Sequence, residues 1–456
     1  MKLSRLSFSL AIAIILFVSC ESFLDIDTPR NQLVTGSVFL DNTLAEGAVA
    51  GIYQEMFSAR ATHFASGGEN SVTALLGIAA DDLVSNVSNS VTDAFSANDW
   101  LTDNTAVYNL WASAYKSIFR ANEVLEGLAA SSSVSRSVAD RLRGEALFVR
   151  AFCHFYLVNL YGPVPLATTA DYRVTSLLHR SPEVEVYAQI SNDLTEAAGL
   201  LPDGYDHAGG ERIRPNKWAA AALCARVALY RGEWQEAAKL ASDVIAQTGD
   251  YAVLDNPDAV FLKNSREAIW QLLPVNAATA NTHEGLFAIP TPGQQTAPRY
   301  SPGEALLAGF VAGDARQTSW LASYTVPTTG ETFAYPFKYK VRSTASGSEI
   351  EEYSTILRLA EQYLIRAEAR AELGDLDGAL ADVNVPLVRH GGLAPLAGLD
   401  KAGVMAAIER ERLVEFFYEW GHRWFDLKRW GRHGKLLPIP QREREANPFL
   451  TQNDGY

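Results

Sequence analysis

ALCARVALYRGEWQEAAKLASDVI, residues 222–245, recurs later in the chain as YLIRAEARAELGDLDGALADVNVP, residues 363–386. In each copy an apolar helical pattern reaches a glycine, and a second helical pattern follows it. Small alanine residues lie where the two helices would cross, and small side chains let helices approach closely. The matched positions are Ala225 and Ala367, Gly232 and Gly374, and Ala237 and Ala379. The repeat therefore predicts two similar helix hairpins.

Hairpins of this composition are typical of tetratricopeptide repeats, which stack so that neighbouring pairs share one core. Periodic apolar residues predict further helices near residues 44–58, at 104–128, at 137–162 and at 401–431. Another helix is predicted over residues 181–202, because it opens on a serine and a proline and closes before a second proline. The expected fold is mostly α-helical.

A different kind of sequence separates the two copies. Residues 249–350 are rich in Pro, Gly, Thr, Ser and Asn, and runs such as EAIWQLLPV and FAYPFKYKV predict short strands between loops. A second irregular stretch, residues 65–101, separates the first two predicted helices. Because long irregular insertions in compact proteins are usually functional, residues 249–350 are the expected ligand-binding part.

The N-terminus has the pattern of an export signal. Lys2 and Arg5 provide the positive charge, and Leu10 to Val18 form an apolar run too short to cross a bilayer. Cys20 follows directly after small and apolar residues, as in the lipobox of bacterial lipoproteins. We therefore expect residues 1–19 to be a signal peptide and Cys20 to carry the lipid anchor, because several acyl chains hold a protein on a membrane.

Composition and charge limit the classes of partner. The chain has 456 residues, with 39 Lys+Arg against 53 Asp+Glu, which argues against nucleic acid because phosphate binding needs a basic face. This balance favours a neutral ligand over a strongly anionic polymer. Cys153 and Cys224 lie in apolar helical surroundings and are expected to be buried hydrophobic residues rather than half of a disulfide framework.

Six blocks of the chain matter together because of their order: CESFLDIDTP, RGEALFVRAFCHFYLVNLYGPVPL, VYAQISNDLTEAAGLLP, LAEQYLIRAEARAELGD, ERERLVEFFYEWGHRWFDLKRWG and LPIPQREREANPFLTQNDGY. Taken in this order, they resemble the SusD/RagB family of outer-membrane lipoproteins. The resemblance implies about four tetratricopeptide-like helix pairs and an irregular part that carries the ligand site. It divides the chain into the signal peptide (1–19), the lipid anchor and N-terminal helix pairs (20–248), the insertion (249–350), and a C-terminal helix pair, long helix and tail (351–456).

The resemblance also implies a function. Members of the family sit on the cell surface, bind glycans or in some cases peptides, and deliver them to a SusC-like TonB-dependent transporter in the outer membrane. They have no catalytic activity, and we expect no cofactor and no metal. The helix pairs are expected to face the transporter.

The search for enzyme signatures agrees with a binding role. The chain lacks G-x-S-x-G, P-loop, H-E-x-x-H and C-x-x-C motifs. Asp81 and Asp82 are adjacent carboxylates, which point apart on a regular element and are expected in capping or loop hydrogen bonds. The run IERER (residues 408–412), with Glu415 and Glu419 after it, has the spacing of a surface ion-pair face.

Sugar binding needs flat apolar rings beside groups that hydrogen-bond hydroxyls. Aromatic residues on helical ridges serve the core, and Trp270 in an apolar run is expected to be core as well. Aromatic residues in the two irregular stretches remain as candidates, and polar neighbours of one of them could bind hydroxyls. The predicted ligand-binding residues are Trp100, Asn98, Asp99, Tyr300, Trp320 and Tyr324.

Three alternatives stay open on the sequence. The chain could capture a peptide instead of an oligosaccharide. It could be a glycoside hydrolase on a helical scaffold, which would require two carboxylates facing one cleft about 5 to 9.5 Å apart. It could also be a tetratricopeptide scaffold for protein partners, with an exposed apolar concave face. The particular ligand, its affinity, a supporting ion and the stoichiometry with a transporter do not follow from the sequence.

Overall fold

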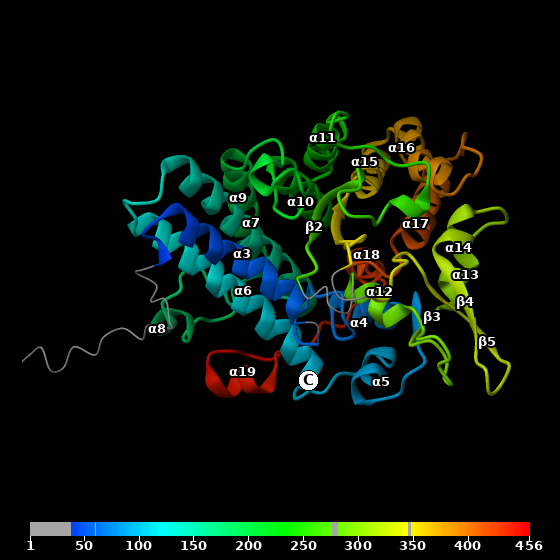
Figure 1. The fold of residues 1–456 in the computed structure, drawn as a ribbon, viewed down its shortest axis with the longest axis horizontal. Coiled ribbons are helices and arrows are strands. Elements are labelled where there is room, and N and C mark those ends of the chain that lie inside the picture. Colours follow the sequence, from blue (N-terminus) through cyan, green and yellow to red (C-terminus); the bar gives the residue numbers. More distant parts are fainter. Residues whose placement is uncertain (1–37, 60, 276–280, 345–347) are drawn as a thin grey trace, which may run out of the picture.

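The computed structural model describes residues 38–59, 61–275, 281–344 and 348–456 (Figure 1). The predicted signal peptide and Cys20 lie outside these residues. Most of the described chain is helical, as expected. The long helices are α3 (Asn42–Ser58), α6 (Thr105–Ala130), α7 (Arg136–Tyr161), α9 (Glu183–Leu200), α10 (Lys217–Tyr230), α11 (Trp234–Ile245), α15 (Leu359–Leu373), α16 (Leu376–Arg389) and α17 (Lys401–Phe416).

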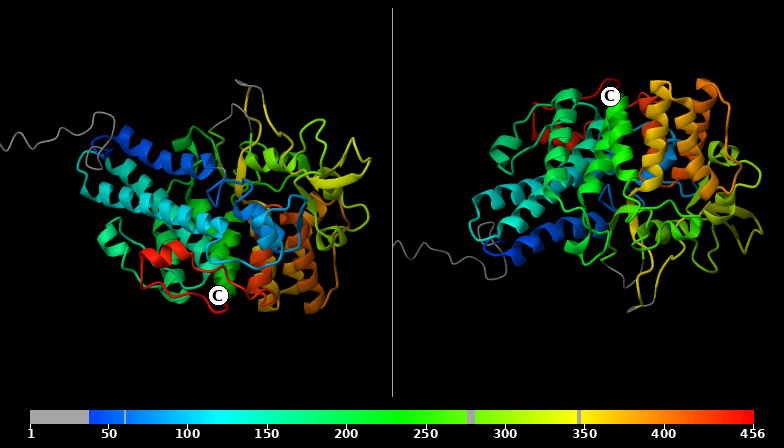
Figure 2. Two further views of the ribbon diagram at one scale, coloured as in Figure 1. Left: turned by 90° about the horizontal axis from the view of Figure 1, so that it is seen from below. Right: turned by 90° about the horizontal axis from the view of Figure 1, so that it is seen from above.

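Eight of these helices form one continuous series in which each packs against the next. The series runs α6, α7, α9, α10, α11, α15, α16 and α17, and it divides into four consecutive pairs. Figures 1 and 2 show the helices side by side, from α6 and α7 at one end to α16 and α17 at the other. Helix α3 covers α6 and α7 at the first end. No helix among the described residues is long and apolar enough to span a membrane.

The two copies of the repeat are the hairpins α10–α11 and α15–α16, which confirms the sequence pattern. Their turns contain Gly232 and Gly374, whose φ angles of 69° and 89° fall in the left-handed region that favours glycine. The alanines at the crossing points are fully buried. Because α11 packs directly against α15, the two hairpins are neighbours in space although more than a hundred residues separate them.

The predicted helix over residues 401–431 is wrong in one respect. It is broken into α17 and α18 (His422–Arg429) by a buried turn. Tyr418, Trp420 and Gly421 have φ angles of 57°, 48° and 72° in this turn. A Cβ atom on Gly421 would lie 2.5 Å from the Leu76 side chain, so glycine is needed there for space as well as for its backbone angle.

The insertion forms short elements rather than a separate core. Its strands are β2 (Ala268–Leu272), β3 (Tyr300–Pro302), β4 (Leu321–Thr325) and β5 (Thr332–Pro336), and its helices are α12 (His283–Ala288), α13 (Glu304–Gly309) and α14 (Ala315–Ser319). The hairpin β4–β5 extends at the right edge of Figure 1. The other two strands pair outside the insertion, β2 with β6 (Ser354–Arg358) and β3 with β1 (Leu83–Ser85), and both pairs are antiparallel.

The remaining elements are short and do not belong to the helical series. Helices α4 (Val72–Ala79) and α5 (Ser90–Ser96) follow α3, and α8 (Tyr172–Thr175) follows α7. Helix α19 (Gln441–Ala446) begins the C-terminal segment, and 3-10 turns lie at Asp206–Ala208 and Pro257–Ala259. Within the described residues Cys153 is buried, Cys224 is half-buried, and both are free thiols.

A buried ionic cluster joins the insertion to α17, and it corrects the prediction of a surface ion-pair face. Glu411 and Glu415 are fully buried, as are the arginines that contact them. Arg316 of α14 donates to Glu411 Oε1 at 2.5 Å and to Glu415 Oε2 at 2.8 Å. Arg358 at the end of β6 donates to Glu415 Oε1 at 2.5 Å. The partners come from segments far away in the sequence, so helical spacing alone did not identify them.

Candidate functional site

The insertion contains a hollow that combines an aromatic ring with polar side chains. It is lined by α12 and the loop after it, by Val87 just beyond β1, and by Arg342. We call it the insertion hollow, and its principal side chains are Phe287, Gln294, Arg299 and Arg342. Its volume of about 340 Å³ lies at the lower end of the range of ligand pockets, about 300–1,000 Å³.

Strand pairing and side-chain hydrogen bonds hold the loop that borders the hollow. Asn86 N–H donates to the Arg299 carbonyl at 2.9 Å, which continues the β1–β3 ladder. The Asn86 side chain donates to the Pro298 carbonyl at 2.9 Å. On the other side, Gln294 Nε2 donates to the Ala297 carbonyl at 2.7 Å. The loop is therefore fixed from both the N-terminal half and its own side chains.

The base of the hollow is built on α12, which the C-terminal half supports. Glu284 of α12 is buried and accepts a hydrogen bond from Ser354 Oγ at 2.5 Å. Burial raises the pKa of Glu284 to about 7. Tyr418, in the turn between α17 and α18, donates to the Glu284 carbonyl at 3.1 Å. The helix below the hollow is thus attached to the helical scaffold.

Three of the predicted ligand aromatics are core residues in the structure. Trp100, Tyr300 and Trp320 expose 1%, 1% and 0% of their surface. Trp100 packs edge-on against Phe95, with ring centroids 5.6 Å apart. Trp320 donates from its indole nitrogen to the Pro257 carbonyl at 3.0 Å. These three rings present no free face to a sugar, so the structure assigns them to packing, in correction of the prediction.

The other predicted residues lie in two different places. Asp99 is exposed and forms an ion pair of 3.0 Å with Lys435, which also donates to the Asn98 carbonyl. Tyr324 is half-buried on β4, and its hydroxyl donates to the Gln294 carbonyl at 2.5 Å, beside the insertion hollow. Ligand contact by Asn98, Asp99 and Tyr324 stays a prediction, and only Tyr324 touches a residue of the hollow in these contacts.

Sequence reasoning missed Phe287, Arg299 and Arg342. The sequence contained a signal for Arg299. Successive side chains of a strand point to opposite faces, so the residue next to a buried aromatic ring points away from the core. Tyr300 was selected as the aromatic, but its ring points into the core, next to Tyr418 at 5.7 Å between ring centroids. Its neighbour Arg299 lines the hollow instead.

One group of side chains in the described residues has the spacing of a metal site. Glu267, His390 and Glu415 are all buried and place ligand atoms within 4.8 Å of one another. Arg358 already donates to Glu267 at 2.9 Å and to Glu415. Burial alone would lower the pKa of His390, but the two carboxylates outweigh it and raise this pKa to about 9. A protonated His390 and Arg358 neutralise the carboxylates, so this is a structural ionic cluster.

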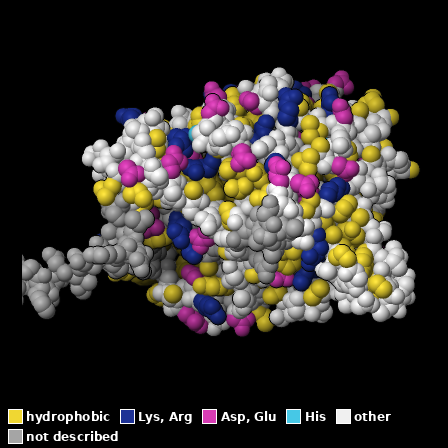
Figure 3. Space-filling model, in the orientation of Figure 1, with side chains coloured by type: hydrophobic (Ala, Val, Ile, Leu, Met, Phe, Trp, Pro, Cys, Tyr) yellow, Lys and Arg dark blue, Asp and Glu magenta, His cyan; other side chains and the backbone are white. Residues whose placement is uncertain are grey.

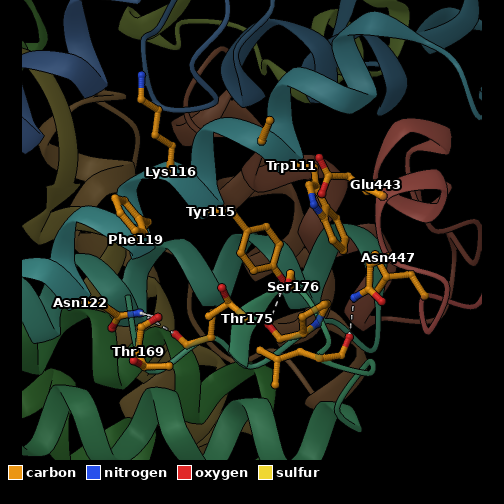
Figure 4. Close-up of a pocket in the computed structure, with 16 residues that line it drawn as sticks. Trp111, Tyr115, Lys116, Phe119, Asn122, Thr169, Thr175, Ser176, Glu443 and Asn447 are labelled. Atoms are coloured by element: carbon orange, nitrogen blue, oxygen red, sulfur yellow. Dashed lines mark hydrogen bonds between the residues drawn. The ribbon is translucent and has the colours of Figure 1, made fainter. Parts of the chain in front are cut away.

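A second cleft, of about 420 Å³, lies between α6 and the C-terminal segment (Figure 4). Trp111, Tyr115 and Phe119 of α6 follow one another at four-residue spacing along it, and Glu443 and Asn447 come from the C-terminal segment. Polar groups in this cleft hold its walls together. Tyr115 donates to the Pro165 carbonyl at 2.8 Å, and Asn447 donates to the Leu178 carbonyl at 2.9 Å.

The two hollows therefore differ in chemistry. The second cleft is lined mainly by apolar side chains, and the polar contacts described above hold its walls together. The insertion hollow has an aromatic ring together with two arginines, and for Arg342 the described residues engage only one of the N–H donors. Because a sugar needs both an apolar face and hydrogen-bonding groups, the insertion hollow is the better candidate.

Comparison with known proteins gives a consistent result. A family model described as "Starch-binding associating with outer membrane" matches residues 23–229, and one described as "SusD family" matches residues 307–435. "SusD-like protein P25" of Formosa agariphila is 25% identical, with 96% of each chain covered. A "SusD-like protein" of Bacteroides ovatus is 26% identical, covering 98% of this chain and 85% of the relative.

Solved structures extend the comparison to the fold. A SusD superfamily protein of Bacteroides vulgatus superposes with a TM-score of 0.78 and 22% identity, over 92% of this chain and all of the other. A structure described as "Laminarin binding SusD-like protein" superposes with a TM-score of 0.75 and 25% identity, over 91% of this chain and 99% of the other.

Proposed function

This chain belongs to the SusD/RagB family, and from that premise we propose that it captures an oligosaccharide and delivers it to a SusC-like TonB-dependent transporter. The family consists of non-catalytic glycan-binding proteins associated with the outer membrane, so the chain is a binding protein and not an enzyme. An oligosaccharide as ligand is supported by the laminarin-binding neighbour, which shares the fold over nearly its whole length.

The insertion hollow is the site that we propose for the ligand. The observation that carries this assignment is the half-buried ring of Phe287 beside two arginines in one hollow. The ring offers a flat apolar surface for the C–H face of a pyranose, and the arginines offer N–H donors for its hydroxyls. Among the described residues no Asp or Glu lines this hollow, so they supply no carboxylate pair of the kind that a glycoside hydrolase uses.

Surface capture requires an anchor and a partner. We propose that Cys20 carries the lipid anchor at the outer membrane and that the helical series faces the transporter. Co-purification of a TonB-dependent barrel with the tagged native chain tests the partnership. Mass spectrometry of the mature N-terminus tests the acylation of Cys20, and an unmodified N-terminus would contradict it.

The ligand site is tested by oligosaccharide binding to the full chain and to single variants. Phe287→Ala should weaken binding at least about tenfold, because it removes the stacking surface that an apolar face needs. Phe119→Ala is the matched control, since Phe119 is an exposed phenylalanine in the second cleft. Equal loss in both variants, or loss only in Phe119→Ala, would refute the assignment. Selective retention of peptides instead of sugars would favour peptide capture.

A further inference from the structure

The charge inside the insertion hollow is opposite to the charge of the chain as a whole. The chain carries a net charge of −14, yet the charged residues that line the hollow are Arg299 and Arg342. The carboxylate that the structure places against them is Glu69, whose Oε2 lies 2.9 Å from Arg299 Nη1. The positive charge of Arg299 is therefore partly compensated, whereas the ion pairs of the described residues include no partner for Arg342.

Arg342 has one hydrogen bond to the protein, and its other donors are available to a ligand. Its Nε donates to the Ile289 carbonyl at 3.1 Å, at the start of the loop that also contains Arg299. This contact uses one of the five N–H donors of the guanidinium, and the described residues supply no other hydrogen-bond partner for it. Two parallel N–H donors of a fixed guanidinium match the two oxygens of a carboxylate or sulfate.

Arg299 and Phe287 form the second part of the same surface. The guanidinium of Arg299 lies 5.4 Å from the centroid of the Phe287 ring, which fixes the side chain by a cation–π contact. Its carbonyl is held by Asn86 in the strand ladder. The hollow is therefore lined by an aromatic ring and by two cations, each of which has a contact with the protein.

The acidic surface of the chain does not prevent an anion from binding here. Charges on exposed groups are screened over about 8 Å at physiological ionic strength. Figure 3 shows basic and acidic side chains interspersed on the face that it displays, without one continuous acidic region. Recognition inside the hollow depends on the groups at contact distance, and these are arginines.

We propose that the insertion hollow selects an acidic sugar unit, whose carboxylate or sulfate oxygens are bound by Arg342 with support from Arg299. The apolar face of the same sugar ring lies against Phe287. This inference rests on the proposed function, because it specifies the ligand of the proposed site. It replaces the neutral ligand that the overall charge favours with an anionic one.

Two matched pairs of probes separate charge from shape. The first pair is trigalacturonate and its methyl ester, which differ in the carboxylates. The second pair is a κ-carrageenan oligosaccharide and its desulfated product. Binding of the full chain to each is measured by calorimetry, together with a panel of neutral laminarin and starch oligosaccharides. At least one acidic probe should bind about tenfold or more tightly than its neutral partner, and the pair that responds identifies the oxyanion.

Arginine variants link this preference to the hollow. Arg342→Gln should weaken binding of the preferred acidic probe by about ten- to a hundredfold, and Arg342→Lys should retain more of it, because loss of a charge-assisted hydrogen bond has this effect. Arg136→Gln, at an exposed position on α7, changes the net charge equally and should leave affinity unchanged. Thermal melts of all variants verify that each is folded.

The outcomes are distinguishable. Equal binding within both pairs of probes, or unchanged binding in folded Arg342→Gln, overturns the acidic-sugar inference. If neutral oligosaccharides bind in that case, the proposed function stands. Failure of every acidic and neutral sugar to bind would overturn both the inference and the proposed function.

Discussion

Substitution of Glu415 tests whether the buried ionic cluster attaches the insertion to the helical scaffold. Glu415 lies on α17, is fully buried, and faces three cationic groups. It accepts from Arg316 at 2.8 Å and from Arg358 at 2.5 Å, and His390 Nδ1 lies 2.9 Å from its Oε1. Burial alone would raise the pKa of Glu415, but His390 and Arg358 hold it well below its usual value, so the side chain is ionised.

Glu415→Gln keeps the shape of the side chain and removes its charge. Breaking a buried ion pair by removing one partner costs about 3–5 kcal/mol, because the remaining charge stays buried without compensation. Two guanidiniums and one imidazolium lose a partner here, which places the expected loss of unfolding free energy in that range. Glu409→Gln on the same helix is the control. Glu409 is 25% exposed and pairs with Arg423 and Arg432, so its loss should cost less than about 1 kcal/mol.

Urea unfolding at pH 7, followed by tryptophan fluorescence, measures both losses. Trp320 is a suitable local probe, since its ring centroid lies 5.5 Å from that of His390. Glu415→Gln should shift the unfolding midpoint well below that of wild type, and Glu409→Gln should stay near wild type. If Glu415→Gln lies within about 1 kcal/mol of wild type, or if the two variants are equally destabilised, the reasoning about this cluster is refuted.

Three further predictions concern single residues. The pKa of His390 is raised to about 9, so its protonation stabilises the folded state fully below pH 6.5, and this stabilisation of about 3 kcal/mol is lost as the pH rises to 9. The difference in unfolding free energy between wild type and His390→Gln should therefore shrink from pH 6.5 to pH 9. A constant difference would contradict this prediction. Gly374→Ala should lower stability by about 1 kcal/mol, because the residue has φ of 89°, and an unchanged unfolding midpoint would argue against this strain. Trp320→Ala should cost about 3–5 kcal/mol while the folded variant keeps its sugar affinity in calorimetry; selective loss of affinity at unchanged stability would restore Trp320 as a ligand residue.

The helical part of the fold could be predicted because its determinants are local. The repeat has small alanines where its two helices cross and glycines in the turns between them. Each of these residues is required by a helix or turn that lies close to it in the sequence. Helix α6 likewise begins one residue after its capping Asn104, close to the predicted start. Sequence periodicity predicts the packing of a residue wherever its partner lies on the same or the next helix.

The buried charges could not be predicted for the opposite reason. Glu411 and Glu415 have the spacing of exposed ion pairs, and that spacing is compatible with either environment. They can be buried because Arg316 and Arg358, which belong to two other segments, form ion pairs with them. The interpretation as a surface face failed because Glu411 and Glu415 pair with arginines of the insertion and of β6, not with residues of their own helix.

The candidate site shows a similar limit. Position in a loop was used as a sign of exposure for Trp100, Tyr300 and Trp320, but loops that fill the space between packed elements also need core residues. Their aromatic rings supply that core. The hollow is instead lined by Phe287 and Arg299, which are half-buried and lie in or beside short elements. Loop position separates variable from regular backbone, and it does not by itself separate binding residues from packing residues.

The turn between α17 and α18 explains how a loop-rich site can be rigid enough to bind. Trp420 N–H donates to Thr73 Oγ1 at 3.2 Å, and its indole donates to the Thr355 carbonyl at 2.7 Å. Tyr418 reaches α12 below the hollow. Left-handed backbone at two aromatic residues is costly and persists only where surrounding contacts fix it. One strained turn of the helical scaffold therefore supports α4, β6 and α12 together. The residues that set the position of the hollow are buried, whereas those that line it are mostly partly exposed, so ligand specificity can change without loss of the fold.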